Sequence, residues 1–140
     1  MPALPGKMTK LEELGMSASL VILVLDDHVD VAESLGEILE LKGHTAKIVH
    51  CGPDAVEAFR KVMFDLAIFD VKMPGMNGVE AFLAIKNFRP DARIVMMSGY
   101  ADDGLVARAM DGGALGLLRK PFAIEDLMTR VDAIAAAPGN

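Results

Sequence analysis

The chain contains few of the residues from which disulfide frameworks, aromatic cofactor sites and membrane spans are built. Its 140 residues include one cysteine, one tyrosine and no tryptophan. A lone cysteine cannot form an internal disulfide, and we interpret Cys51 as a small, partly buried side chain rather than a reactive thiol. The longest apolar run, residues 20–25, is far shorter than the roughly 20 residues that cross a bilayer. The sequence therefore predicts no membrane span.

Positive charge is also scarce. The chain has 14 Lys and Arg against 20 Asp and Glu, which gives a formal net charge of −6. Nucleic-acid binding depends on Lys and Arg neutralising phosphates, so we expect no direct nucleic-acid partner. The opening residues, MPALPGKMTKLEELG, contain no apolar core of the length that a secretory signal requires. We therefore expect a cytoplasmic protein.

Hydrophobic residues make up 52% of the chain and charged residues 24%, which is typical of one globular domain with one core. Short apolar runs rich in Val and Ile alternate with segments of helical period. The runs that predict strands are residues 20–25, 46–49, 66–69, 93–97 and 115–118. The segments that predict helices are residues 31–42, 53–62, 78–87, 103–110 and 124–136. We expect Val31 and Val62 to face inward.

This alternation predicts the α/β class, with five parallel strands joined by right-handed crossovers. The strands read as continuous apolar runs, as expected when helices cover both faces of the sheet. The predicted architecture is thus a doubly wound (βα)5 fold, a five-stranded parallel sheet in a three-layer α/β/α arrangement.

Polar side chains stand where these strands end. Asp26 and Asp27 follow the first strand, Asp70 the third, Ser98 the fourth and Lys120 the fifth. In an open parallel sheet, sites form at the carboxyl ends of the strands. Carboxylates crowded there repel one another by several kcal/mol per pair at an effective dielectric of about 20. Mg²⁺ relieves such repulsion and accepts carboxylates, waters and backbone carbonyls, so we predict a magnesium site at this edge.

Each of these residues has a simpler interpretation when it is taken alone. Asp26 and Asp27 would cap the following helix, Asp70 would form a turn, Ser98 would be a loop hydroxyl and Lys120 a solvated surface lysine. Four such coincidences at the same end of four strands are improbable, so we favour the functional interpretation. His28 follows the acidic pair, and we interpret it as a solvent-facing residue rather than a ligand.

Four segments in order resemble the receiver domain of bacterial two-component response regulators, the CheY-like family. They are LVLDDHVDVAESL, LAIFDVKMPGMNGVE, IVMMSGYAD and GALGLLRKPF, and the resemblance covers about residues 18–136. It implies a flavodoxin-like strand order 2-1-3-4-5. It also implies that Asp70 is phosphorylated by a histidine kinase or a phosphotransfer protein, without the domain being an enzyme for another substrate. Phosphorylation and dephosphorylation would be self-catalysed.

The resemblance also implies roles for the other residues at the strand ends. Asp27 would ligate Mg²⁺ directly, Asp26 partly through water, and the carbonyl of Lys72 and the carboxylate of Asp70 would complete the protein ligands. Ser98 would hydrogen-bond a phosphoryl oxygen. Lys120 would pair with Asp70 at rest and with the phosphoryl group afterwards, and the Lys120–Pro121 bond would be cis.

A downstream effector or output domain is implied as a second partner, on the face formed by the fourth helix, fifth strand and fifth helix. A homodimer formed on phosphorylation is left open as a further partner. Leu117 stands where the family usually has Tyr or Phe, which leaves the aromatic part of the switch open. Lys72 and Tyr100 are expected at the mouth of the site, where they would influence dephosphorylation.

Residues 1–17 lie outside the resemblance and form an N-terminal extension. The spacing of Thr9 and Glu12 matches a capping box, so this extension is either a short helix or disordered. We place the receiver domain at residues 18–137 and a tail at 138–140. The ending AAAPGN is linker-like, which keeps open a receiver cut from a longer regulator or hybrid kinase.

Two other functional classes fit the residues less well. A magnesium-dependent aspartyl phosphatase would need its nucleophile and acid two residues apart after the first strand, and DDHVD offers no such pair. A flavodoxin-type electron carrier would need a phosphate-binding loop at that place and aromatic side chains around the flavin. The chain has acid there, one Tyr and no Trp.

Overall fold

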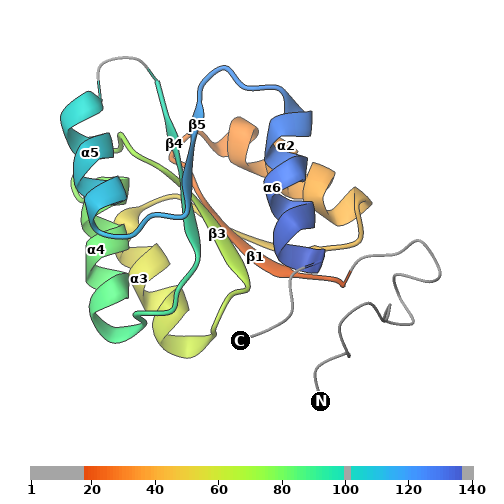
Figure 1. Cartoon of the computed structure of the whole chain (residues 1–140), viewed down its shortest axis with the longest axis horizontal. Helices are drawn as coiled ribbons and strands as arrows, with labels where there is room; N and C mark the ends of the chain where they lie inside the picture. The colour runs from red at the N-terminus through yellow and green to blue at the C-terminus, as the bar shows by residue number, and fades with distance from the viewer. Residues whose placement is uncertain (1–17, 100–101, 137–140) are drawn as a thin grey trace.

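The computed structural model describes residues 18–99 and 102–136, which form a parallel sheet between two layers of helices (Figure 1). The strands are β1 (Val21–Leu25), β2 (Thr45–Val49), β3 (Leu66–Asp70), β4 (Ile94–Ser98) and β5 (Gly116–Arg119). Their order is β2-β1-β3-β4-β5, and every pair of neighbours is parallel. The predicted fold class and strand order are therefore confirmed.

The helices are α2 (Val29–Leu41), α3 (Gly52–Lys61), α4 (Gly78–Phe88), α5 (Asp103–Asp111) and α6 (Ile124–Ala136). Figure 1 shows α2 and α6 on one face of the sheet and α3, α4 and α5 on the other. The start of α4 is fixed by a capping box, in which Asn77 Oδ1 accepts from the Glu80 backbone N–H and Glu80 Oε1 accepts from that of Asn77. This helix begins directly after the loop that follows β3.

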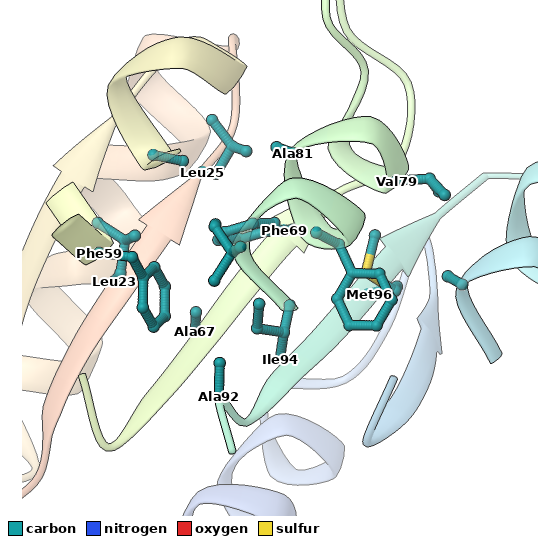
Figure 2. Close-up of a cluster of buried hydrophobic side chains, with 14 of the residues drawn as sticks. Leu23, Leu25, Phe59, Ala67, Phe69, Val79, Ala81, Ala92, Ile94 and Met96 are labelled. Carbon is teal, nitrogen blue, oxygen red and sulfur yellow. The ribbon is translucent and has the colours of Figure 1, made fainter. Parts of the chain in front are cut away.

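The core lies in two clusters, one on each face of the sheet. Figure 2 shows the cluster under α3, α4 and α5, where Phe59 and Phe69 pack edge to face with ring centroids 6.5 Å apart. Every residue of β3 and β4 is buried. Because both central strands are enclosed on both faces, the side chains at their carboxyl ends are held by a rigid support.

Two side chains predicted to face inward are exposed. Val31 is 50% exposed because it lies beside the buried stripe of α2, which runs through Ala32 and Leu35. Val62 is 47% exposed because α3 ends at Lys61 and the backbone of Val62 is extended. Both predictions were wrong because helix phase and helix end were each misjudged by about one residue. Cys51 is partly buried, as expected.

Some expectations fall on residues outside the described part of the chain. These are the capping-box spacing in residues 1–17, the position of Tyr100, and the tail at residues 138–140. Among the residues that the structure describes, no helix is both long enough and apolar enough to cross a membrane.

Candidate functional site

The structure brings Asp26, Asp70 and Lys120 together at the carboxyl edge of the sheet. Lys120 Nζ lies 3.1 Å from Asp26 Oδ2 and 3.3 Å from Asp70 Oδ2. The three residues come from the ends of β1, β3 and β5, which lie at one edge because the strands are parallel. The juxtaposition predicted from the strand ends is thus present, including the pairing of Lys120 with Asp70. The Lys120–Pro121 peptide bond is cis, as the resemblance implied.

Asp70 is the last residue of β3, and the loop after it folds back tightly onto the strand. The Gly78 backbone N–H donates to the Val71 carbonyl at 2.9 Å. A Cβ atom at Gly78 would overlap the carbonyl oxygen of Asp70, so only glycine fits there. Gly75 takes a φ of 70° in the same loop, a conformation that glycine adopts without strain. The loop therefore fixes the backbone that carries the Asp70 carboxylate.

The neighbouring carboxylates Asp26 and Asp27 differ in their hydrogen bonds. Asp26 is fully buried; its Oδ1 accepts from the His28 backbone N–H at 2.9 Å, and its Oδ2 accepts from Lys120. Asp27 Oδ1 is buried without a hydrogen-bond partner among the described residues. His28 occupies the N-cap position of α2, so neither carboxylate caps this helix. Asp27 is therefore the carboxylate with an oxygen still free to bind something else.

An oxygen-rich group of potential metal ligands results from this arrangement. Asp26, Asp27, His28 and Asp70 each offer one ligand atom, and these atoms all lie within 4.8 Å of one another. The unpartnered oxygen of Asp27 and the carboxylate oxygens around it match the hard ligands that Mg²⁺ accepts. The residues present therefore fit a magnesium ion.

The His28 side chain is 66% exposed, which agrees with the solvent-facing prediction. Its Nδ1 nevertheless lies 3.1 Å from Asp26 Oδ1 and 3.4 Å from Asp27 Oδ1. The sequence gave no sign of these contacts, because a side chain at the first turn of a helix can turn outward or back over the sheet edge. The Nδ1 atom of His28 thus lies beside the carboxylates of Asp26 and Asp27, although most of the side chain faces solvent.

The pKa values of the three contacting groups reflect burial first and their neighbours second. At Asp26, burial raises the pKa, but the hydrogen bond from the His28 backbone and the Lys120 ammonium together outweigh it, so the pKa is lowered. At Asp70, burial outweighs the attraction of Lys120, and the charge of Asp26 adds to it, so the pKa is raised. At Lys120, burial lowers the pKa, but the charges and hydrogen bonds of Asp70 and Asp26 together outweigh it, so the pKa is raised. Of Asp26 and Asp70, Asp70 is thus the one whose negative charge is less well compensated.

Ser98 is fully buried at the end of β4. Its Oγ donates toward the Gly99 carbonyl at 3.0 Å and toward Asp102 Oδ2 at 3.2 Å. Asp102 was missed in the sequence, where an Asp just before a helix is typical of a capping residue. The only available signal was its position, four residues after the hydroxyl in SGYAD.

An open crevice of about 490 Å³ leads to these groups. Asp27, Asp70, Lys72, Asp102 and Lys120 are among the residues that line it. The position of Lys72 agrees with the expectation that it stands at the mouth. A small group that enters this crevice from solvent would thus reach the Asp70 carboxylate.

The family model for the response regulator receiver domain matches residues 22–132 of this chain. This chain belongs to that family. Response regulator MprA of Mycobacterium ulcerans is 33% identical over 116 residues, which are 83% of this chain and 50% of MprA. Response regulator UvrY of Escherichia coli is 33% identical over 117 residues, which are 81% of this chain and 53% of UvrY. The receiver thus spans about half the length of these two relatives.

Solved structures agree with the family assignment. A CheY-like receiver domain protein from Methanospirillum hungatei superimposes with a TM-score of 0.78 at 28% identity, covering 84% of this receiver chain and 93% of that one. NtrX from Brucella abortus superimposes with a TM-score of 0.76 at 26% identity, but only 27% of its chain is covered. Receiver domains generally bind Mg²⁺, and the acidic group described above could hold such an ion.

Proposed function

We propose that this receiver domain accepts a phosphoryl group on Asp70 from a histidine kinase or a phosphotransfer protein. The observation that carries the proposal is the placement of the Asp70 carboxylate in the open crevice, 3.3 Å from Lys120 Nζ. Phosphoryl transfer places charge on the equatorial oxygens of the group in flight, so a protein catalyses it mainly by positioning groups and compensating charge. This crevice offers both.

Asp70 is the nucleophile in this proposal. One of its carboxylate oxygens forms a bond to phosphorus while the bond from phosphorus to the nitrogen of the donor histidine breaks, and the released imidazole takes up a proton. An ionised carboxylate needs no general base for this attack. The tight loop from Val71 to Gly78 holds the backbone of Asp70 in place while the donor approaches.

Lys120 and Ser98 would hold the phosphoryl oxygens. Lys120 lies within 3.3 Å of two carboxylates, so its ammonium can follow the negative charge from Asp70 to the phosphoryl group with a small movement. Ser98 is buried at the end of β4, next to Gly99, which lines the crevice, and its hydroxyl has one proton to donate.

Asp26, Asp27, Asp70 and the carbonyl of Lys72 would hold the magnesium ion. Asp26 already has two donors and would act partly through water, while Asp27 has an unpartnered oxygen for direct ligation. The ion supplies compensation of the negative charge that the phosphoryl oxygens carry.

The other parts of the proposal extend to regulation and partners. Self-catalysed phosphorylation and dephosphorylation make the domain a phosphoacceptor rather than an enzyme with an external product. The face formed by α5, β5 and α6 would contact an effector, an output domain of a longer regulator, or a second copy after phosphorylation. We retain residues 18–137 as the receiver domain, residues 1–17 as an extension, a tail at 138–140, and a cytoplasmic location.

Acetyl phosphate with Mg²⁺ tests the proposal in the absence of any partner. We expect the intact mass of the wild-type chain to increase by one phosphoryl group, and that of Asp70→Asn to stay unchanged. Asp91→Asn makes the same chemical change at an exposed turn before β4 and should be labelled like the wild type. A label retained in Asp70→Asn, or none in the wild type, would contradict the assignment.

A further inference from the structure

Asp102 occupies the N-cap position of α5 but does not cap it. No side-chain hydrogen bond joins it to the first turn of the helix, although Asp at this position usually accepts one from a backbone N–H. Its Oδ2 instead accepts from Ser98 Oγ at 3.2 Å, and the residue is only 9% exposed. Asp102 thus gives its own helix no side-chain cap, while its carboxylate shares the Ser98 hydroxyl with the Gly99 carbonyl, which lies 3.0 Å from Ser98 Oγ.

This arrangement conflicts with the role of Ser98 in the phosphorylated state. A serine hydroxyl has a single proton, so Ser98 cannot fully serve the Asp102 carboxylate and a phosphoryl oxygen together. We propose that Asp102 is a positioning residue that holds Ser98 in the unphosphorylated state and competes with the phosphoryl group for its hydroxyl. The inference rests on the proposed function of Asp70.

The charges around the crevice favour release of Asp102 once a phosphoryl group arrives. Asp102 lines the same crevice as Asp70, so a phosphoryl group on Asp70, close to dianionic, adds negative charge to the crevice that already holds the Asp102 carboxylate. Lys120, Lys72 and a magnesium ion would compensate only part of this charge, and Arg119 is already paired with the exposed Asp103 at 3.0 Å. Repulsion therefore drives the Asp102 carboxylate away from Ser98.

The released carboxylate would cap α5 once the Asp102 backbone, now at a φ of −113° and a ψ of 22°, turns to the extended conformation typical of capping residues. The first backbone N–H groups of α5 lack a side-chain acceptor from Asp102, and an Asp at the N-cap position is among the preferred residues for that role. Phosphorylation would thus exchange a Ser98–Asp102 hydrogen bond for a capped α5. Because α5 belongs to the proposed effector face, this exchange connects Asp70 to that face without the aromatic side chain that Leu117 replaces.

Beryllofluoride, which mimics a phosphoryl group on an aspartate, measures the competition in the presence of Mg²⁺. Hydrogen bonds to a charged acceptor are about twice as strong as those to a neutral one, so Asp102→Asn should release Ser98 more readily and bind beryllofluoride about fivefold more tightly. Asp103→Asn removes a carboxylate from the adjacent, exposed position. It should change the affinity less than about twofold, because surface charges are well screened. Equal effects of the two variants would mean that charge alone acts, and would overturn the proposal, as would an unchanged affinity of Asp102→Asn.

Amide hydrogen exchange tests whether Asp102 caps α5 once Ser98 has been released. On beryllofluoride binding, the first turn of α5 should gain protection in the wild type and in Asp102→Asn, since Asn also caps helices. Asp102→Ala should bind the mimic at least as tightly as the wild type but gain no such protection. Equal gain in Asp102→Ala would show that Asp102 does not move to the helix.

A ligand-free double-mutant cycle separates failure of this inference from failure of the proposed function. Ser98→Ala, Asp102→Ala and the double variant are compared by urea unfolding without phosphodonor or mimic. We expect non-additivity of about fivefold in the unfolding equilibrium constant, as for a buried hydrogen bond. Additive effects would show that Ser98 and Asp102 are not energetically coupled, and would overturn the proposed role of Asp102. A wild type that shows coupling but binds no beryllofluoride would overturn the proposed function and, with it, the competition.

Discussion

Lys120 is the cation that allows Asp26 and Asp70 to lie side by side, so its removal tests the electrostatics of the crevice. Its Nζ lies 3.1 and 3.3 Å from the two carboxylates. At an effective dielectric of about 20, each contact is worth roughly 5 kcal/mol of attraction before desolvation is subtracted. Removing one partner of a buried pair costs about 3–5 kcal/mol. The Lys120 side chain is 27% exposed, so we expect Lys120→Met to lose about 2–4 kcal/mol at neutral pH without Mg²⁺.

The loss should shrink as the pH is lowered. Without Lys120, both carboxyls have higher folded pKa values, and an acid with a raised folded pKa destabilises the fold only while it is ionised. In the wild type, the lowered pKa of Asp26 contributes stability that is lost as the pH falls through that folded pKa. Both effects reduce the difference in free energy of unfolding between the wild type and Lys120→Met at acidic pH.

Urea unfolding in EDTA across this pH range is the assay. Lys61→Met is a matched control, because Lys61 pairs with Glu57 at 3.8 Å on the exposed side of α3. It should cost less than about 0.5 kcal/mol. If Lys120→Met loses no more stability than this control, or if its deficit grows as the pH falls, Lys120 does not stabilise the paired carboxylates.

Three further predictions concern the same edge of the sheet. Because burial raises the pKa of Asp70, Asp70→Asn should stabilise the metal-free protein at neutral pH. This gain in the free energy of unfolding should fade as the pH falls through the folded pKa of Asp70. Urea unfolding across the pH range measures the gain, and a gain that stays constant would contradict the prediction. Gly78→Ala should cost about 1–3 kcal/mol of stability in thermal unfolding, because the added Cβ meets the Asp70 carbonyl. Gly104→Ala is the control and should cost nothing, because no atom lies near its Cβ. Equal losses in the two variants would contradict the close approach of Gly78 to Asp70. Mg²⁺ should raise the thermal midpoint by mass action, and Asp27→Asn should lose most of that shift; an undiminished shift would place the ion elsewhere.

The meeting of Asp26, Asp70 and Lys120 could be predicted because it depends on topology alone. Continuous apolar runs identified the strands, the alternation with helices made them parallel, and parallel strands bring their carboxyl ends to one edge. Each predicted strand end lies within one residue of the observed one. The chemistry at the strand ends therefore followed from strand boundaries that apolar runs define well.

The contacts of Asp102 and His28 could not be predicted in the same way. Both side chains lie at helix starts, where local sequence predicts a cap or a solvent-facing residue and only the folded arrangement decides. Asp102 turns to Ser98 instead of its helix, and His28 turns back over Asp26. Val31 shows the same limit on packing, since helical period alone did not fix which edge of the apolar stripe is buried.

The most direct test of the account is to identify the residue that carries the phosphoryl group. Borohydride reduces an aspartyl phosphate to homoserine, which tandem mass spectrometry locates in the peptide after treatment with acetyl phosphate and Mg²⁺. We predict homoserine at position 70 and at no other aspartate of the crevice. Homoserine at position 26, 27 or 102 with none at 70 would contradict the central claim.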